Sequence, residues 1–283
     1  SGRDDVIDIL ARYFSDKSSS EVYTVTGFDG VGKTSLLQKI QEQNTDVVMI
    51  SDVKGKYAEE LIRYLLRQII FSQPIYPKLS KEEKLFLLGL LSKSEKELIH
   101  ELRSAIVQLT SKNEFILLID DFNLFDQLAG DLFLEIIPLF QVNNINIVMT
   151  ESSEHNFLSS RINNVKEIAL GPFTENELLS FLEESYISDF PVDAIKNLIT
   201  DNADLIPGNI KSFIQDLILP GIMKFSEGGV FFSDEENKLS NLYKAHSAIY
   251  DLRLANLSKI ELHAAKIISA IDIFIDSNIL SIL

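Results

Sequence analysis

The stretch Gly27-Phe28-Asp29-Gly30-Val31-Gly32-Lys33-Thr34 decides the fold. It fits the G-x-x-x-x-G-K-[ST] pattern of a phosphate-binding loop. Such a loop must aim several backbone N–H groups at one phosphate, and glycine is needed where a Cβ would block the approach. Lys33 would place a positive charge on the β- and γ-phosphates, and the Thr34 hydroxyl would bind Mg²⁺. The stretch therefore predicts a nucleotide site.

The residues on either side of the loop support this prediction. Residues 22–26 are rich in β-branched and aromatic side chains, as expected of a strand, and residues 35–40 have helical spacing. A helix that starts directly after the loop adds the positive end of its dipole to the phosphate site. The loop residues that we expect to bind the nucleotide are Gly27, Asp29, Gly30, Val31, Gly32, Lys33, Thr34 and Ser35.

A second chemical landmark is the apolar run Phe115–Ile119, which is followed by Asp120 and Asp121. Wholly apolar runs are typical of central strands in parallel sheets. Ligands of such sheets bind at the carboxyl ends of the strands, so both acids should reach the metal at the loop. In this Walker B arrangement Asp120 would hold Mg²⁺, and Asp121 would orient or deprotonate the attacking water. A structural Asp-Asp turn is the alternative.

The remaining pattern predicts an α/β fold of the P-loop NTPase type. Strands are expected at residues 47–51, 145–150 and 165–170, and helices at 4–14, 57–72, 94–111 and 131–140. Strands that alternate with helices indicate a parallel sheet with helices on both faces. The nucleotide-binding domain should span residues 1–172.

Thr150 ends the fourth expected strand and is a candidate catalytic residue. Its hydroxyl could bond the γ-phosphate or the attacking water, or it could simply be satisfied within the strand end. Glu151 would repel the phosphate unless it points away, and it is the next candidate for the catalytic base. Arg161 could act on a neighbouring subunit or be an ordinary surface arginine.

The chain after residue 172 changes to a helical pattern. Thr174 and Glu177 form a capping-box pattern at the start of a helix, with a possible staple between Phe173 and Leu178. Further helices at 191–202 and 210–219 complete a small helical lid domain, residues 173–220. Residues 223–233 indicate a hairpin, and helices are expected at 238–256 and 258–271. Residues 221–283 would then form a partial winged-helix-like domain, truncated at its end.

Composition narrows the function classes. The chain has 26 basic and 42 acidic residues, a net charge of −16, which works against attraction to nucleic acid or anionic lipid. It has no cysteine, so disulfides and thiolate metal sites are excluded. Residues 1–5 do not resemble a signal peptide, and no apolar run is long enough to span a membrane. We expect a soluble, cytoplasmic piece of a longer protein.

The chain resembles the STAND class of AAA+-related signalling ATPases, in particular the ATPase modules of large bacterial regulators. The stretches that carry the resemblance are residues 1–4, the two Walker stretches and residues 170–178. The resemblance implies a regulatory switch in which ATP or ADP sets the position of the lid and the winged helix. It also implies Mg²⁺ as cofactor, flanking sensor and effector domains as partners, and a homo-oligomer in the ATP state.

The resemblance also assigns roles to residues outside the loop. It implies that Gly2 and Arg3, which match the Gly-Arg box of the family, lie near the nucleotide base. The family's lid element matches residues 207–211, which makes Pro207 and Lys211 candidate nucleotide contacts. Ile210 stands where the family has proline, and Lys211 stands where an AAA+ sensor has arginine, whose planar fork lysine does not reproduce.

Three other functions remain open at this point. A GTPase would need the N-K-x-D motif, whose nearest match, Asn237–Ser240, lacks the acid. A DNA-associated AAA+ ATPase of the origin-recognition type would need a positive surface, but residues 221–283 hold 6 basic and 8 acidic residues. A module that holds ADP without hydrolysing ATP would be separated from the switch by single-turnover hydrolysis.

Overall fold

The structure is a computed structural model that describes residues 3–15, 21–53, 56, 58–153, 161–162, 164–185, 196, 199–200, 205–218, 223–226 and 229–232. The chain divides into two compact units. The first comprises Ser1–Glu184 and Ala203–Ile210, and the second comprises Ser185–Asn202 and Lys211–Leu283. The first unit therefore contains the sheet and the first residues of a later helix.

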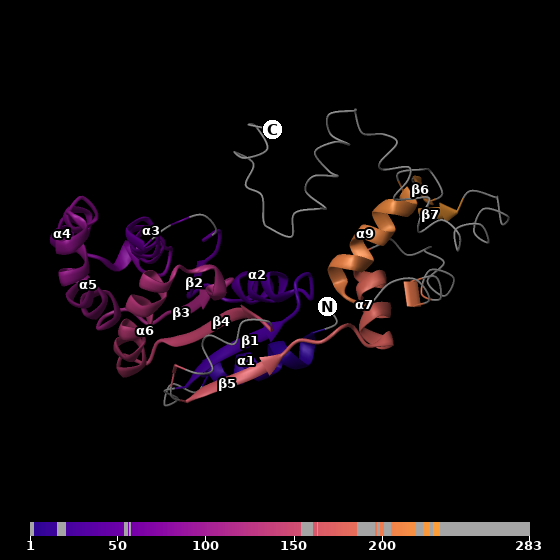
Figure 1. The fold of residues 1–283 in the computed structure, drawn as a ribbon, viewed down its shortest axis with the longest axis horizontal. Coiled ribbons are helices and arrows are strands. Elements are labelled where there is room, and N and C mark those ends of the chain that lie inside the picture. The colour runs from indigo at the N-terminus through magenta and orange to yellow at the C-terminus, as the bar shows by residue number, and fades with distance from the viewer. Residues whose placement is uncertain are drawn as a thin grey trace. The chain divides into compact units, whose positions relative to one another are not determined.

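The first unit is built on a five-stranded parallel sheet, as the sequence predicted (Figure 1). Its strand order is β2-β3-β4-β1-β5. The strands are β1 (Val22–Gly27), β2 (Val47–Ile50), β3 (Ile116–Ile119), β4 (Asn146–Ser152) and β5 (Val165–Ala169). The strand β1 pairs with β4 and β5, and the central strand β4 also pairs with β3. The phosphate-loop sequence and the acids after β3 therefore meet at the same edge of the sheet.

One face of the sheet packs on α1 (Asp4–Ser15) and α2 (Lys33–Gln43). The spacing of apolar residues produces this packing, because Leu10 of α1 and Leu37 of α2 are fully buried beside Val25 of β1. Side chains alternate in direction along each strand, so neighbouring residues point to opposite faces of the sheet. Adjacent residues of one strand, Leu117 and Leu118, accordingly belong to different core clusters.

The opposite face packs on α3 (Ala58–Ile70), α5 (Glu95–Thr110) and α6 (Gln127–Val142). The helix α4 (Lys81–Leu91) contacts α3 and α5. Sequence reading predicted only a break near Pro74 and Pro77 between two helices, and it missed α4 and the short 3₁₀ helix Tyr76–Lys78. The missed signal was the capping box of Ser80 and Glu83, both of whose hydrogen bonds are present.

Two further helices follow the sheet. In α7 (Glu175–Ser185) the predicted capping box is confirmed, since the Thr174 N–H donates to Glu177 over 2.6 Å and the Glu177 N–H donates to the Thr174 hydroxyl over 3.3 Å. The helix α9 (Pro207–Ile218) begins three residues before the predicted position 210. Proline is tolerated at the first helical position, where its missing N–H leaves no helix bond unmade.

Within the second unit, β6 (Met223–Ser226) and β7 (Gly229–Phe232) pair antiparallel and form the predicted hairpin. The predicted helices at 238–256 and 258–271 lie outside the described residues, as does most of the one at 191–202. Among the helices that the structure describes, none is long and apolar enough to cross a membrane.

Candidate functional site

The loop between β1 and α2 has the backbone that phosphate binding requires. Gly30 and Gly32 have φ angles of 78° and 102°, in the left-handed region that side chains other than glycine rarely adopt. Gly32 immediately precedes α2, and its carbonyl accepts the Leu36 N–H over 2.9 Å. The free N–H groups of the first helical turn and the positive end of the helix dipole therefore face the loop.

Lys33 is buried at the first position of α2. Its ammonium donates to the Gly27 carbonyl over 2.8 Å and to the Phe28 carbonyl over 3.1 Å. It also lies 3.9 Å from the exposed carboxylate of Asp29. The positive charge is thus held inside the loop by main-chain oxygens, where a phosphate would meet it.

The two acids after β3 are joined by Thr150 of β4. The Thr150 hydroxyl donates to Asp120 Oδ1 over 2.7 Å and accepts the Asp121 N–H over 2.8 Å. Thr150 is fully buried and Asp120 is 5% exposed. The backbone of Asp121 is left-handed, with φ of 51°. These two hydrogen bonds hold the carboxylate of Asp120 and the backbone of Asp121 on the same hydroxyl.

The pKa of Asp121 is raised above its ordinary value of 3.8, mainly by burial and next by the negative charge of Asp120. The positive charge of Lys33 acts in the opposite direction. Two neighbouring carboxylates close to a loop lysine favour the arrival of a cation or a proton. This electrostatic setting is typical of acids that handle protons or metals.

The donor set fits Mg²⁺. Thr34 is exposed on the first turn of α2 and offers a hydroxyl, and Asp120 offers carboxylate oxygen. Both are the hard oxygen ligands that Mg²⁺ prefers, and this ion usually completes its shell with phosphate oxygens and water. The neighbouring Ser35 is exposed as well.

The other candidates at this edge of the sheet have defined positions. Glu151 is 1% exposed and lies opposite Thr26 in the register of β1 and β4. Arg161 forms an ion pair with Asp131 of α6 over 2.5 Å. Asn123 was not predicted from the sequence, yet its side chain accepts the Ser152 N–H over 3.2 Å and so ties the turn after β3 to the end of β4.

The start of α9 lies directly on the phosphate loop. The Gly208 N–H donates to the Gly30 carbonyl over 2.9 Å. A Cβ on Gly208 would lie 3.0 Å from Gly30 Cα and 3.2 Å from its oxygen, so any larger residue would have to push the two backbones slightly apart. Pro207 is buried, and its ring Cγ lies 4.0 Å from the position that a Cβ on Gly32 would occupy. Lys211, in the second unit, is exposed.

Arg3 lies at the junction between β5 and α7. Its guanidinium donates to Glu177 over 3.2 Å and to the Gly171 carbonyl, and it stacks 4.9 Å from the ring centre of Phe173. Sequence reading did not anticipate these partners, because nothing in the spacing relates residue 3 to residue 177. Gly2 lies outside the described residues. The contact of Arg3 with the nucleotide base stays a prediction.

Comparisons with known proteins fit this geometry. Residues 1–148 match the AAA ATPase domain family. One similar solved structure is a signal transduction ATPase with numerous domains (STAND) protein from Pyrococcus horikoshii, which has a tetratricopeptide repeat sensor; its identity is 17% and its TM-score is 0.46. The match covers 95% of this chain and 35% of that one.

Two further solved structures are similar to this chain. DnaA from Aquifex aeolicus, bound to AMPPCP, has 13% identity and a TM-score of 0.49, covering 90% of this chain and 69% of that one. The Drosophila origin recognition complex bound to DNA has 16% identity and a TM-score of 0.41, covering 71% and 49%. No curated protein sequence matches the chain.

Proposed function

We propose, since the chain belongs to the AAA ATPase domain family, that it binds ATP or ADP with Mg²⁺ and acts as a slowly hydrolysing switch module of a larger signalling protein. The chain spans about a third of the length of the STAND protein that it resembles, 35%. The flanking sensor and effector domains therefore belong to the proposal, as do the STAND class and a homo-oligomer in the ATP state.

Nucleotide binding is supported by the loop. The glycines at positions 30 and 32 leave the backbone free to approach a phosphate, and Lys33 supplies a positive charge that is already held in place. The adjacent helix end adds a favourable dipole. We expect adenine over guanine, because the chain has no complete N-K-x-D motif.

Hydrolysis is supported by the bridge from Asp120 through Thr150 to Asp121, and this is the observation that carries the proposal. Asp120 and Thr34 would hold the Mg²⁺, which shields the phosphate charge when it is bound. Asp121 would orient the attacking water and take its proton at the carboxylate. Thr150 binds the carboxylate of Asp120 and the backbone N–H of Asp121 through its two hydrogen bonds. It would thus act through Asp120 and Asp121.

A switch is supported by the contact of α9 with the phosphate loop. Any movement of the peptide that carries the Gly30 carbonyl must displace Gly208, because Gly208 donates a hydrogen bond to that carbonyl and the two backbones are in contact. ATP and ADP could therefore shift the helix between two arrangements if they place this peptide differently. Pro207 and Lys211 are the proposed nucleotide contacts on α9, and Arg3 and Gly2 those near the base.

The DNA-associated alternative is not favoured. A net charge of −16 repels the phosphate backbone of nucleic acid, and sequence-independent attraction supplies most of the affinity of such proteins.

Single-turnover hydrolysis tests the proposal most directly. The parent chain should bind ATP and convert it slowly to ADP in the presence of Mg²⁺. Lys33→Ala should lower the affinity for ATP by about 10- to 100-fold, which corresponds to the loss of one charge-assisted hydrogen bond. Asp121→Asn should slow hydrolysis by about 10²- to 10⁴-fold and leave ATP affinity unchanged. Binding without any hydrolysis by the parent would point instead to a module that only holds nucleotide.

A further inference from the structure

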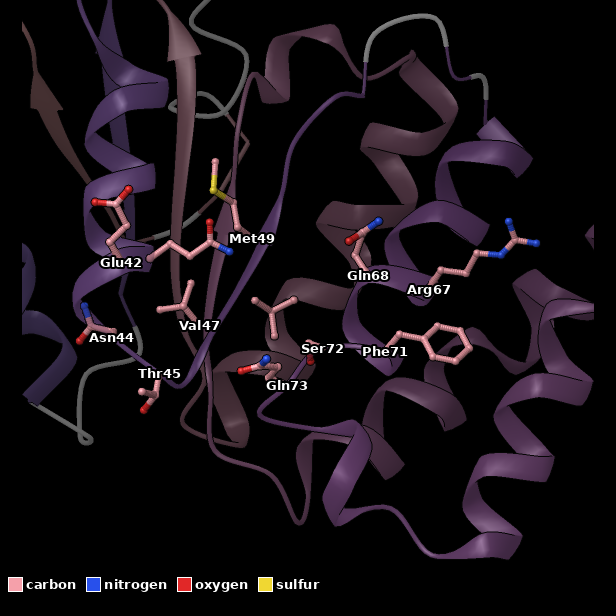
Figure 2. Close-up of a pocket in the computed structure, with 12 residues that line it drawn as sticks. Glu42, Asn44, Thr45, Val47, Met49, Arg67, Gln68, Phe71, Ser72 and Gln73 are labelled. Atoms are coloured by element: carbon pink, nitrogen blue, oxygen red, sulfur yellow. The ribbon is translucent and has the colours of Figure 1, made fainter.

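A groove separate from the nucleotide site runs along β2, the edge strand of the sheet. It has a volume of about 490 Å³. Figure 2 shows Val47 and Met49 of β2 at its centre, between the end of α2, marked by Glu42 and Asn44, and the last turn of α3, marked by Gln68. The walls are therefore two helix ends, and the floor is the sheet edge itself.

The backbone of β2 offers hydrogen-bonding groups to this groove. The carbonyls of Asp46 and Ile50 point to β3, since they accept the N–H groups of Ile116 and Asp120, each over 2.8 Å. Main-chain groups alternate in direction along a strand, so the N–H and C=O of Val47 and Met49 point away from β3. Among the described residues, no strand pairs with this edge.

The edge also lacks the features that normally block pairing. Edge strands are usually protected by lysine, proline or a bulge, but β2 consists of Val47-Val48-Met49-Ile50. Next to it stand polar side chains that can bond a peptide backbone, namely Gln41, Asn44, Thr45, Gln68, Ser72 and Gln73. The groove is thus suited to an extended main chain.

Its electrostatics favour a basic occupant. The carboxyl ends of α2 and α3 both line the groove, and a helix carries negative partial charge at that end. The last turn of α2 has no basic residue and contains Glu42. Arg67 of α3 points away from β2 in Figure 2. Arg67 also lines the groove and offsets the negative end of α3, so positive side chains of an occupant would be attracted mainly to the α2 side, where Glu42 and the helix end carry negative charge.

The flanking helices decide what kind of chain can enter. Since α2 and α3 contact β2 from opposite faces of the sheet, a second copy of this domain would bring its own covering helices against them. A single extended segment has no such helices. We propose that the groove at the β2 edge binds an extended, basic segment of a partner protein, which adds to the sheet as a further strand.

The test uses the whole 283-residue chain and three synthetic peptides. The first, acetyl-Lys-Val-Lys-Val-Lys-Val-amide, is basic and can form a strand. The second replaces each lysine by glutamate. The third replaces each valine by proline and keeps the charge without the main-chain donors at those positions, which controls for unspecific attraction to an acidic protein. We expect the first peptide to bind at least about tenfold more tightly than either of the others. Hydrogen exchange should slow at Val47 and Met49.

Two variants probe the groove itself. Met49→Pro removes an outward N–H that β3 does not use, so the sheet should form while binding of the first peptide is lost. Glu42→Lys, on an exposed helix end, should weaken the basic peptide and strengthen the acidic one, each by several-fold. Glu135→Gln on the exposed side of α6 is the matched control and should change neither.

Equal binding of the basic and proline peptides, or no effect of Glu42→Lys, would overturn the proposal, and so would dimerisation through this edge in sedimentation experiments. Nucleotide binding, measured in parallel, should be unaffected in all variants.

Discussion

The contact between Gly208 and Gly30 makes a sharp prediction for Gly208→Ala. The added Cβ would lie 3.0 Å from Gly30 Cα, 3.2 Å from its oxygen and 3.6 Å from its carbonyl carbon. All three atoms belong to the backbone of Gly30, not to a side chain that could turn away. The loop or the start of α9 must therefore shift by a few tenths of an ångström.

The free-energy cost of Gly208→Ala has two unfavourable contributions and one favourable one. Overpacking by one methyl group typically costs about 1–3 kcal/mol. Loss of the 2.9 Å hydrogen bond from the Gly208 N–H adds about 0.5–1.5 kcal/mol. Alanine is a better helix former than glycine by up to about 1 kcal/mol, which offsets part of this near the start of α9. We expect the contact to weaken by about 1–3 kcal/mol in total, since these contributions partly overlap.

If α9 helps to retain the nucleotide, this loss should appear in the release rate. A weakening of 1–3 kcal/mol corresponds to release that is faster by about 5- to 150-fold. Stopped-flow displacement of a fluorescent ADP analogue measures it directly, and Asn209→Ala, at an exposed position one residue along, is the matched control. Release at the parent rate from a folded Gly208→Ala protein would refute the reasoning that α9 and the loop are coupled.

Three further predictions follow from other contacts. The raised pKa of Asp121 predicts that the rate of hydrolysis falls as the pH is lowered, beginning above the ordinary pKa of 3.8, because the protonated acid cannot accept a proton. This acidic limb should be absent from the pH–rate profile of Asp121→Asn. Tyr13→Phe should lower the free energy of unfolding by about 1–3 kcal/mol in urea titrations, because the buried hydroxyl accepts the Ile147 N–H over 3.1 Å and its loss leaves that donor unpaired. Arg3→Ala should lower the thermal midpoint more than Arg3→Lys does, since lysine keeps the charge near Glu177. Equal losses in scanning calorimetry would show instead that a positive charge alone does not replace the guanidinium.

The sheet and the loop could be predicted because their signals are local. The β-branched and apolar runs at β1, β3 and β4 mark strands wherever they occur in the chain. The loop pattern fixes its own backbone through Gly30 and Gly32. The acids were expected on a strand beside the loop strand, but β4 lies between β3 and β1. Asp121 still lies close enough to feel the charge of Lys33, since the carboxyl ends of parallel strands share an edge.

Other parts of the site could not be predicted because they depend on distant partners. Thr150 was correctly placed on a strand, although β4 continues to Ser152, and its two hydrogen bonds to Asp120 and Asp121 follow from the pairing of β3 with β4. The ion pair of Arg3 with Glu177 joins residues that lie 174 positions apart. Such contacts leave no periodicity in the sequence, so only the packed chain reveals them.

The same distinction explains why the phosphate loop can be both rigid and responsive. Its left-handed glycines fix it locally, whereas the Gly30 carbonyl is held from outside by the start of α9. A carbonyl cannot turn without turning the N–H of the same peptide plane, which here belongs to Val31. That N–H donates to the Phe28 carbonyl over 3.3 Å, a long hydrogen bond that a phosphate could replace. In the proposed function, a phosphate that competed for the Val31 N–H would thus act on Gly208 through this one rigid peptide.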